Sequence, residues 1–311
     1  MLKKLFYFLI LSSFLSISVL SVGADDAVYL VSEIKANKGE LKVKLSGEKN
    51  SRTLKPLQSL KAGDIVSVTK NAYAVLLETA SGKAVTVKEG NAPFTVKGAA
   101  KQEESSFKNI FAKIGDSLKG KKKEMNYVPL VVRSVRLKKP TIVMPKDTLL
   151  LSEKPMFFWT GSSKDEIVIK LKDSSGNMIF QKTVLSRYSL KYPDEISPLK
   201  PGTYRWELEI EESPLQKAEF KIPEAETKKM VIEKLKFIDS TKLPKTTKAI
   251  LKSEILLSEN FIEDARVELV KAYINDKEEP TIHLLLGEIY KKIGHNDMAL
   301  EEFDEAQYLS Q

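Results

Sequence analysis

The side chains that most often carry out chemistry are scarce in this chain of 311 residues. It has no cysteine, which excludes disulfides, cysteine–zinc sites, iron–sulfur clusters and thiol nucleophiles. Its two histidines, His283 and His295, leave little material for histidine metal sites or Ser-His-Asp triads. No other metal-binding residue types cluster with His283, so we expect it to be a packed or half-exposed helix residue. We therefore predict no catalytic residue, no cofactor and no metal.

Carboxylates are the remaining candidates for catalysis, since aspartate and glutamate together number 42. A cell-wall hydrolase with paired carboxylates is therefore an alternative, although no two acids stand at strand ends beside an aromatic cleft. Asp64 follows a glycine, which is typical of an aspartate that accepts backbone N–H groups in a turn. A solvated helix face accounts for the acidic residues near the C-terminus, which are Glu301, Glu302, Asp304 and Glu305.

The elements that would position these residues begin after an N-terminal targeting segment. Residues 1–24 have two lysines, an apolar run and small residues up to Ala24, the layout of a secretory signal cut after that alanine. An uncleaved membrane anchor is the alternative, because the run is near the lower length limit for spanning a bilayer. In either case we expect an exported protein, with the periplasm of a Gram-negative-type envelope as its compartment.

Composition and charge narrow the class of protein further. With 42% apolar and 30% charged residues, the chain is typical of a folded protein with two or three domains. Basic residues outnumber acidic ones between residues 25 and 125, and the balance reverses between residues 245 and 311. A uniformly basic nucleic-acid binder would not show this reversal, so we expect no nucleic acid as partner. An anionic polymer of the cell surface is a more suitable partner for the basic residues between positions 25 and 125.

Residues 27–98 alternate apolar and polar positions between turn signals, which predicts an antiparallel β domain with one buried face. Its expected core includes Val75, Leu77, Val85 and Val87. A strand ending at Gly39, the run 60–66 (LKAGDIV) and the turn at Ser81-Gly82 resemble the extracytoplasmic FecR-type domain. This resemblance implies a small β module for surface sensing or envelope scaffolding, without catalytic residues.

Residues 99–127 read as a linker with a short amphipathic helix and a lysine cluster at 119–123. The apolar stripe consists of Phe107, Ile110, Phe111, Ile114 and Leu118. We favour a solvated linker whose stripe packs on a neighbouring domain. Contact of the basic cluster with an anionic membrane surface is the alternative.

Residues 128–223 contain strand-like runs at a spacing near ten residues, which predicts a β-sandwich. The residues that follow the pattern of immunoglobulin-like or fibronectin-type modules are Pro155, Phe157, Trp159, Ile167, Ile169, Leu171, Asp173, Gly176, Leu199, Pro201, Gly202, Tyr204 and Trp206. The run resembles those modules of bacterial envelope proteins. We expect Trp159 and Trp206 in the core rather than as a sugar-stacking platform.

Residues 226–311 change to helical periodicity and repeat at a separation of 34 residues. The matching positions are Ser253, Leu256, Asn260, Ala265, Leu269 and Ala272 against Gly287, Tyr290, Gly294, Ala299, Phe303 and Ala306. The segment resembles tetratricopeptide (TPR) repeats, with a degenerate helical segment near residues 228–238. This resemblance implies a concave partner-binding groove with Leu284, Glu288 and Lys291 facing it.

The sequence therefore predicts a multidomain protein with a mainly β front and middle and an all-α helical-repeat C-terminus. We expect a non-enzymatic, exported envelope scaffold that binds other envelope proteins or peptides through the TPR groove and the β modules. The runner-up is a protein that binds peptidoglycan or an anionic membrane surface through its basic front and linker. The cell-wall hydrolase is the third alternative.

Overall fold

The computed structural model describes residues 27–98, 140–160, 166–185, 188–211 and 213–310. The N-terminal part forms mainly antiparallel β sheets, with one parallel pair between β10 (Thr148–Leu149) and β16 (Gln216–Ile222), and the C-terminal part forms helices, which confirms the coarse fold class expected from the sequence. We call the three parts the front module (27–98), the middle module (140–222) and the helical module (225–310). The predicted signal segment 1–24 and linker 99–127 lie outside the described residues. Within the described ranges, no helix is long and apolar enough to cross a membrane.

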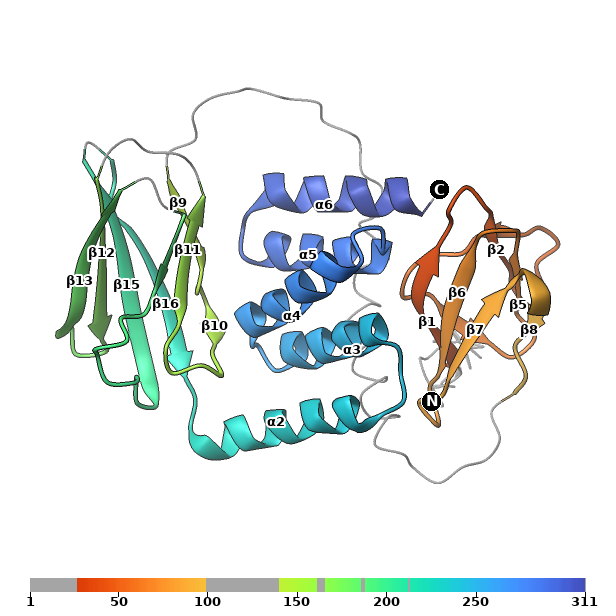
Figure 1. Ribbon diagram of the computed structural model, residues 1–311, viewed down its shortest axis with the longest axis horizontal. Coiled ribbons are helices and arrows are strands. Elements are labelled where there is room, and N and C mark those ends of the chain that lie inside the picture. Colours follow the sequence, from red (N-terminus) through yellow and green to blue (C-terminus); the bar gives the residue numbers. More distant parts are fainter. Residues whose placement is uncertain (1–26, 99–139, 161–165, 186–187, 212, 311) are drawn as a thin grey trace, which may run out of the picture.

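The helical module lies between the two β modules in space, although it comes last in the chain (Figure 1). Its helices present one set of ends to the front module and the other set to the middle module (Figure 1). The order of the modules along the chain therefore differs from their order in the molecule.

The front module consists of two four-stranded sheets, ordered β4-β1-β6-β7 and β3-β2-β5-β8. Apolar residues from both sheets form one core cluster, which includes Val31, Val43 and Leu76. The strands are β1 (Ala27–Lys35), β2 (Leu41–Lys44), β3 (Arg52–Thr53), β4 (Ser59–Lys61), β5 (Ile65–Val68), β6 (Tyr73–Glu78), β7 (Ala84–Lys88) and β8 (Phe94–Thr95), with a short 3-10 helix η2 (Glu89–Asn91) before β8.

The expectation of a single buried face is wrong for the first of these sheets. Val75, Leu77 and Val87 are buried as predicted and Val85 is half-buried. Leu30 and Leu77, however, belong to the core cluster of the helical module, on the side of the sheet away from the front-module core. The sheet is buried on both faces because helices cover its outer face.

The turn before β5 is organised by Asp64, as the sequence predicts. Its carboxylate accepts the backbone N–H of Ser46 at 2.8 Å and that of Lys61 at 2.8 Å. Gly63 has φ of +88°, a left-handed conformation that favours glycine. Asp64 therefore has a structural role, since its side chain is 3% exposed and occupied by backbone donors.

The middle module stacks a five-stranded sheet, β10-β16-β15-β12-β13, on a three-stranded sheet, β14-β11-β9. Trp159 and Trp206 are 2% and 0% exposed, which confirms them as core residues. The ring of Phe157 lies 5.1 Å from that of Trp206, whose Nε1 donates to the carbonyl of Pro145 at 2.7 Å. The strands are β9 (Thr141–Met144), β10 (Thr148–Leu149), β11 (Met156–Thr160), β12 (Glu166–Asp173), β13 (Met178–Leu185), β14 (Ser189–Lys191), β15 (Gly202–Ile210) and β16 (Gln216–Ile222).

The helical module contains α2 (Ala225–Ser240), α3 (Lys245–Ser258), α4 (Ile262–Asn275), α5 (Pro280–Lys292) and α6 (Asn296–Leu309). Helices α3 and α4 form one hairpin and α5 and α6 the next, in step with the 34-residue sequence repeat. The second hairpin is tight because a Cβ at Gly287 would lie 2.6 Å from the ring of Phe303. The expected helical segment near residues 228–238 is the interior of α2.

Candidate interaction surfaces

Helix α5 carries the three residues that the TPR resemblance places in a groove. Glu279 caps the helix by accepting the N–H of Thr281 at 3.0 Å, and Gly294, with φ of +83°, follows its end. Spacings of four and three residues put Leu284, Glu288 and Lys291 on one face of this helix. Leu284 and Glu288 are half-buried and Lys291 is exposed.

The apolar end of this face is tied to both β modules. Leu284 packs against the large core cluster that also contains Leu30 and Leu77 of the front module and Met144 of the middle module. The cluster thus continues from the helices into both neighbours. The face of α5 is therefore presented by helices that are fixed at their two ends, which keeps its shape constant.

The first of these ends is the contact between β1 and the start of α3. Thr247 donates its hydroxyl to the carboxyl of Glu33, and Ser32 donates its hydroxyl to the carbonyl of Val75 at 3.2 Å. The N-cap residue of α3 is Pro244, whose side chain makes no capping hydrogen bond. Glu33 of the front module therefore supplies a hydrogen-bond acceptor for the first turn of this helix.

The start of α5 is joined to the same strand. Oε1 of Glu279 accepts hydrogen bonds from the hydroxyl of Thr281 at 2.6 Å and from the backbone N–H of Ile34 at 3.4 Å. The side chain is 0% exposed, and its Oε2 has no hydrogen-bond partner. Burial and, to a smaller extent, the nearby charge of Glu33 raise the pKa of Glu279 to about 8, against the lowering effect of its hydrogen bonds.

Ion pairs surround this buried contact at its rim. Lys35 on β1 lies 3.2 Å from Asp276 and 3.4 Å from Glu278, both in the connection from α4 to α5. Hydrogen bonds and the charges of these two acids raise the pKa of Lys35 against the effect of burial. Partly exposed pairs of this kind add modest stability and fix the orientation of the two modules.

At the opposite end, Thr148 of β10 caps helix α4. Its hydroxyl accepts the backbone N–H of Ile262 at 2.8 Å and lies 3.0 Å from the carbonyl of Asn260, to which it can donate. Leu149 donates its N–H to the same carbonyl at 2.9 Å. Phe261, the N-cap residue of α4, makes no side-chain capping bond, so the cap comes from the middle module.

Further acids of α4 are also used for packing against the middle module. Asp264 accepts the N–H of Leu151 at 3.1 Å, and burial raises the pKa of Asp264 to about 6. Arg266 makes two bonds of 2.8 Å to Glu263 and stacks over the ring of Phe158 at 4.7 Å. Burial raises the pKa of Glu263 despite the arginine.

The two histidines both have structural partners. His283 is 5% exposed, with Nδ1 2.7 Å from the carboxylate of Glu302 and Nε2 2.9 Å from the carbonyl of Lys277. Burial lowers the pKa of His283, but the bonds to Glu302 and to the carbonyl of Lys277 outweigh it, so the pKa is raised and the charged form of the ring is favoured. His283 is thus a packed helix residue, as expected. His295 places Nε2 2.8 Å from the carbonyl of Ile142 in the middle module.

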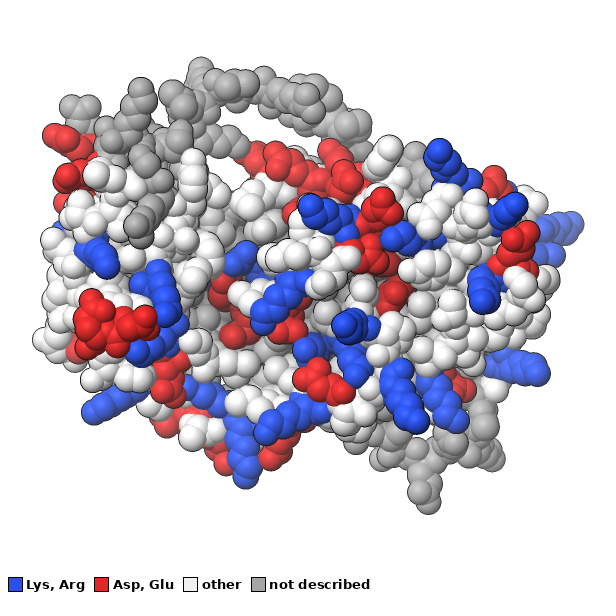
Figure 2. Space-filling model, in the orientation of Figure 1, with Lys and Arg blue, Asp and Glu red and all other residues white. Residues whose placement is uncertain are grey.

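Basic residues of the front module are exposed together with acidic ones: Lys42 lies 2.7 Å from Glu40 and Arg52 lies 3.9 Å from Glu48. On the second front-module sheet, Lys42, Lys44 and Arg52 are exposed, whereas two acids of the module, Glu33 and Asp64, are buried. Figure 2 shows lysine and arginine side chains around the front module, at the right of the view. It also shows acidic side chains along the upper edge of the helical module, where α6 lies.

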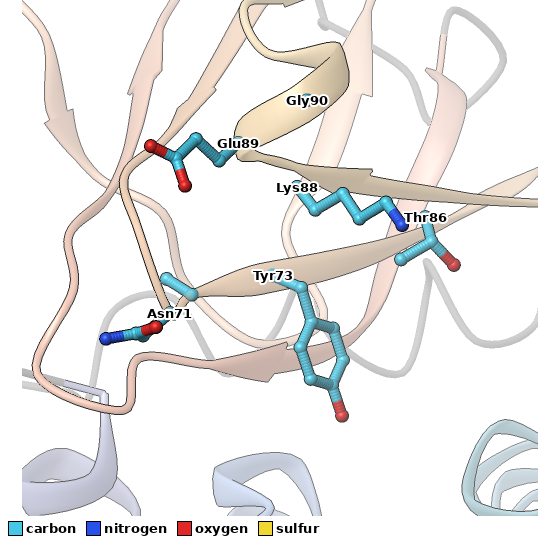
Figure 3. Close-up of a pocket in the computed structure, with 7 residues that line it drawn as sticks. Asn71, Tyr73, Thr86, Lys88, Glu89 and Gly90 are labelled. Atoms are coloured by element: carbon cyan, nitrogen blue, oxygen red, sulfur yellow. The ribbon is translucent and has the colours of Figure 1, made fainter.

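The front module also has a shallow depression of about 490 Å³ between the end of β7 and the start of β6 (Figure 3). Tyr73 and Lys88 extend from neighbouring strands, and Glu89 points away from them (Figure 3). Its lining consists of Asn71, Ala72, Tyr73, Thr86, Lys88, Glu89 and Gly90. It contains one carboxylate, so it does not hold a carboxylate pair. No group of three or more histidine or acidic residues in the described part of the chain could hold a metal ion.

Sequence reasoning missed the residues that join the modules, namely Glu33, Glu279 and Thr148. A glutamate followed by a proline is a signal for the start of a helix, so the capping by Glu279 was readable. Thr148 and Glu33 lie in strands more than a hundred residues from the helices they contact, and no local pattern marks them.

Comparisons with known proteins give distant structural likenesses alone. No family model matches the chain, and no curated protein matches it. Among solved structures, the crystal structure of CopC from Methylosinus trichosporium OB3b aligns at 15% identity over 27% of this chain and 94% of that one. The TM-score is 0.22. A likeness at that level shows neither family nor function.

Proposed function

We propose that the chain is a non-enzymatic, exported scaffold protein of the cell envelope that binds another protein on the α5 face formed by Leu284, Glu288 and Lys291. The observation on which this rests is the attachment of the helix hairpins at both ends, to Glu33 on one side and to Thr148 on the other. A surface fixed in this way binds with little loss of conformational entropy. The TPR, FecR and immunoglobulin-like resemblances support the same modular function.

The use of the buried acids also supports binding over catalysis. A catalytic carboxyl with a raised pKa is expected in a cleft that a substrate can enter. Glu279, Glu263 and Asp264 have raised pKa values, but each lies in a contact between or within modules, where Glu279 and Glu263 are buried and Asp264 is half-buried. Their perturbed pKa values follow from packing.

A charge reversal on α5 tests the proposal. In the full chain, Glu288→Lys with Lys291→Glu changes the proposed face, and Glu233→Lys with Lys236→Glu makes the same change at the same spacing on exposed positions of α2. Crosslinking in the native envelope should recover a partner with the wild type and with the α2 variant. We expect the α5 variant to lose that partner at equal protein level. Equal recovery by all three would contradict the proposal.

A second function is favoured by the exposed basic residues of β2. Binding of peptidoglycan or an anionic membrane surface through Lys42 and Lys44 would weaken as salt rises, because exposed charges are screened within about 10 Å at 0.1 M salt. Co-sedimentation with cell-wall sacculi at low salt should fall in Lys42→Glu with Lys44→Glu. The matched control is Lys182→Glu with Lys200→Glu, two exposed lysines of the middle module. Equal sedimentation of both variants would exclude this surface.

A further inference from the structure

The contact between the front module and the starts of α3 and α5 buries two carboxyl groups. Glu33 is 4% exposed and Glu279 is 0% exposed. The bonds to Glu33 come from Thr247, and those to Glu279 come from Thr281 and the backbone of Ile34. Among the described residues, no ion pair joins either carboxyl to a basic side chain. The two groups are therefore buried without a compensating cation.

The charged and titratable groups around them belong to every element of the contact. Lys35 on β1 is engaged by Asp276 and Glu278 at the rim. Tyr73 on β6 is half-buried, and its pKa is raised by burial and by the charges of Glu33 and Glu279. Asp276 raises the pKa of Glu33 in addition to burial. Apart from Lys35, the neighbours add negative charge or none.

Burial without a cation favours the protonated form of a carboxyl group. The direction is the same for both groups, since the pKa of Glu33 is raised and that of Glu279 is raised to about 8. An ionised Glu279 would also leave a charged Oε2 without a partner in an apolar contact. Ionisation is therefore unfavourable while the modules remain in contact.

We propose that this contact is a proton-dependent joint: the front module stays docked on α3 and α5 while Glu33 and Glu279 are protonated, and it separates from them when they ionise. The released protons pass to solvent, and separation hydrates the two carboxylates. Separation would release the attachment at Glu33 on which the partner-binding proposal rests, so the helices should be held at both ends only in the docked state. Separation requires that the front module can leave the helices while keeping its own core. Leu30 and Leu77, which pack in the core of the helical module, would then become exposed, so ionisation of the two carboxyls acts against this apolar contact.

The direction of the pH dependence follows from proton linkage. In the separated state a hydrated glutamate has its ordinary pKa of about 4.3, so the docked state binds more protons above that pH. The docking equilibrium constant should then fall by up to about tenfold per pH unit for each carboxyl, from about pH 4.5 upward. For Glu279 this fall ends near its pKa of about 8 in the docked state.

The absence of cysteine makes the test direct, because two labels can be attached at chosen sites. Ser67→Cys on the front module and Ser175→Cys on the middle module are exposed positions away from the contact. Spin labels on both report the distance between the modules by pulsed electron resonance. We expect one narrow distance distribution at about pH 5 and a growing population of longer distances up to about pH 9.

Variants assign the change to the two carboxyls. Glu33→Gln combined with Glu279→Gln should keep the narrow distribution at both pH values, whereas Glu48→Gln, an exposed glutamate in the β2–β3 connection of the front module, should behave as the wild type. The proposal is overturned if the wild type shows no change, or if the double variant changes as the wild type does. It is also overturned if near-ultraviolet dichroism of Trp206 is lost at the same pH, since the chain would then be unfolding as a whole. If the double variant does not fold, the wild-type titration decides.

Discussion

Removing the hydroxyl of Thr148 tests whether the middle module caps helix α4. Thr148→Val keeps the shape of the side chain but removes the acceptor for the N–H of Ile262 and the hydroxyl that bonds the carbonyl of Asn260. Thr148 is 3% exposed and Ile262 is 2% exposed, so water does not readily replace these bonds. The substitution should therefore weaken the first turn of α4 and the contact between the modules together.

The expected magnitude follows from the bonds lost. Loss of an N-cap costs about 0.5–2 kcal/mol. A buried donor left without a partner costs about 1–3 kcal/mol. Both costs refer to the same N–H group of Ile262, so they do not add. We expect the free energy of opening this helix end to fall by about 1–3 kcal/mol in Thr148→Val. That free energy corresponds to an increase of about 5- to 150-fold in the local opening constant.

Hydrogen exchange followed by mass spectrometry measures this opening directly. Peptides that cover residues 258–266 of Thr148→Val should exchange faster than those of the wild type, while peptides of β6 should not. The control is Thr183→Val on the exposed part of β13, which should change stability by no more than about 0.5 kcal/mol. If the start of α4 exchanges at the same rate in Thr148→Val as in the wild type, the assignment of Thr148 as the cap is refuted.

Two further predictions concern the α5–α6 hairpin. Gly287→Ala should lower the free energy of unfolding by about 1–3 kcal/mol, because the new Cβ would meet the ring of Phe303. The control is Gly90→Ala, whose new Cβ would have no atom within 4 Å and which should lower that free energy far less. Urea denaturation of both variants measures the difference. His283→Gln should remove the stability that the charged ring gains from Glu302. In the wild type this stability is fully present below the ordinary histidine pKa of about 6.5, and it is lost as the pH rises through the raised pKa of the folded state. The difference in urea midpoint between wild type and His283→Gln should therefore shrink as the pH rises above about 6.5, and a constant difference would contradict the charged ring.

The elements that local patterns specify were predictable from the sequence. Gly287 and Phe303 follow the 34-residue repeat, and their close approach is present in the hairpin. Trp159 and Trp206 stand on predicted strands and lie in the core. The position of Asp64 after a glycine indicated its turn role. Each of these predictions depends on neighbours a few residues away or on a regular period.

The contacts between modules were not predictable in the same way. The alternation around Val75 and Leu77 gives the two faces of a strand but does not say what covers the outer one. Whether Glu33 is buried depends on a helix that starts more than two hundred residues later. The groove positions Leu284 and Glu288 were assigned from a resemblance, and their role in binding stays a prediction. Long-range packing is therefore the part that needs the structure.

The position of the helices between two modules that precede them in the chain has a consequence for folding. Contacts such as Thr247 with Glu33 and Ile262 with Thr148 join residues more than a hundred positions apart, so they close late. Until the last helices are synthesised, Leu30 and Leu77 on one module and Met144 on the other lack their apolar neighbours. A truncated chain would leave these surfaces open to water and prone to aggregation. Truncations from the C-terminus should therefore reduce solubility before they disturb either sheet.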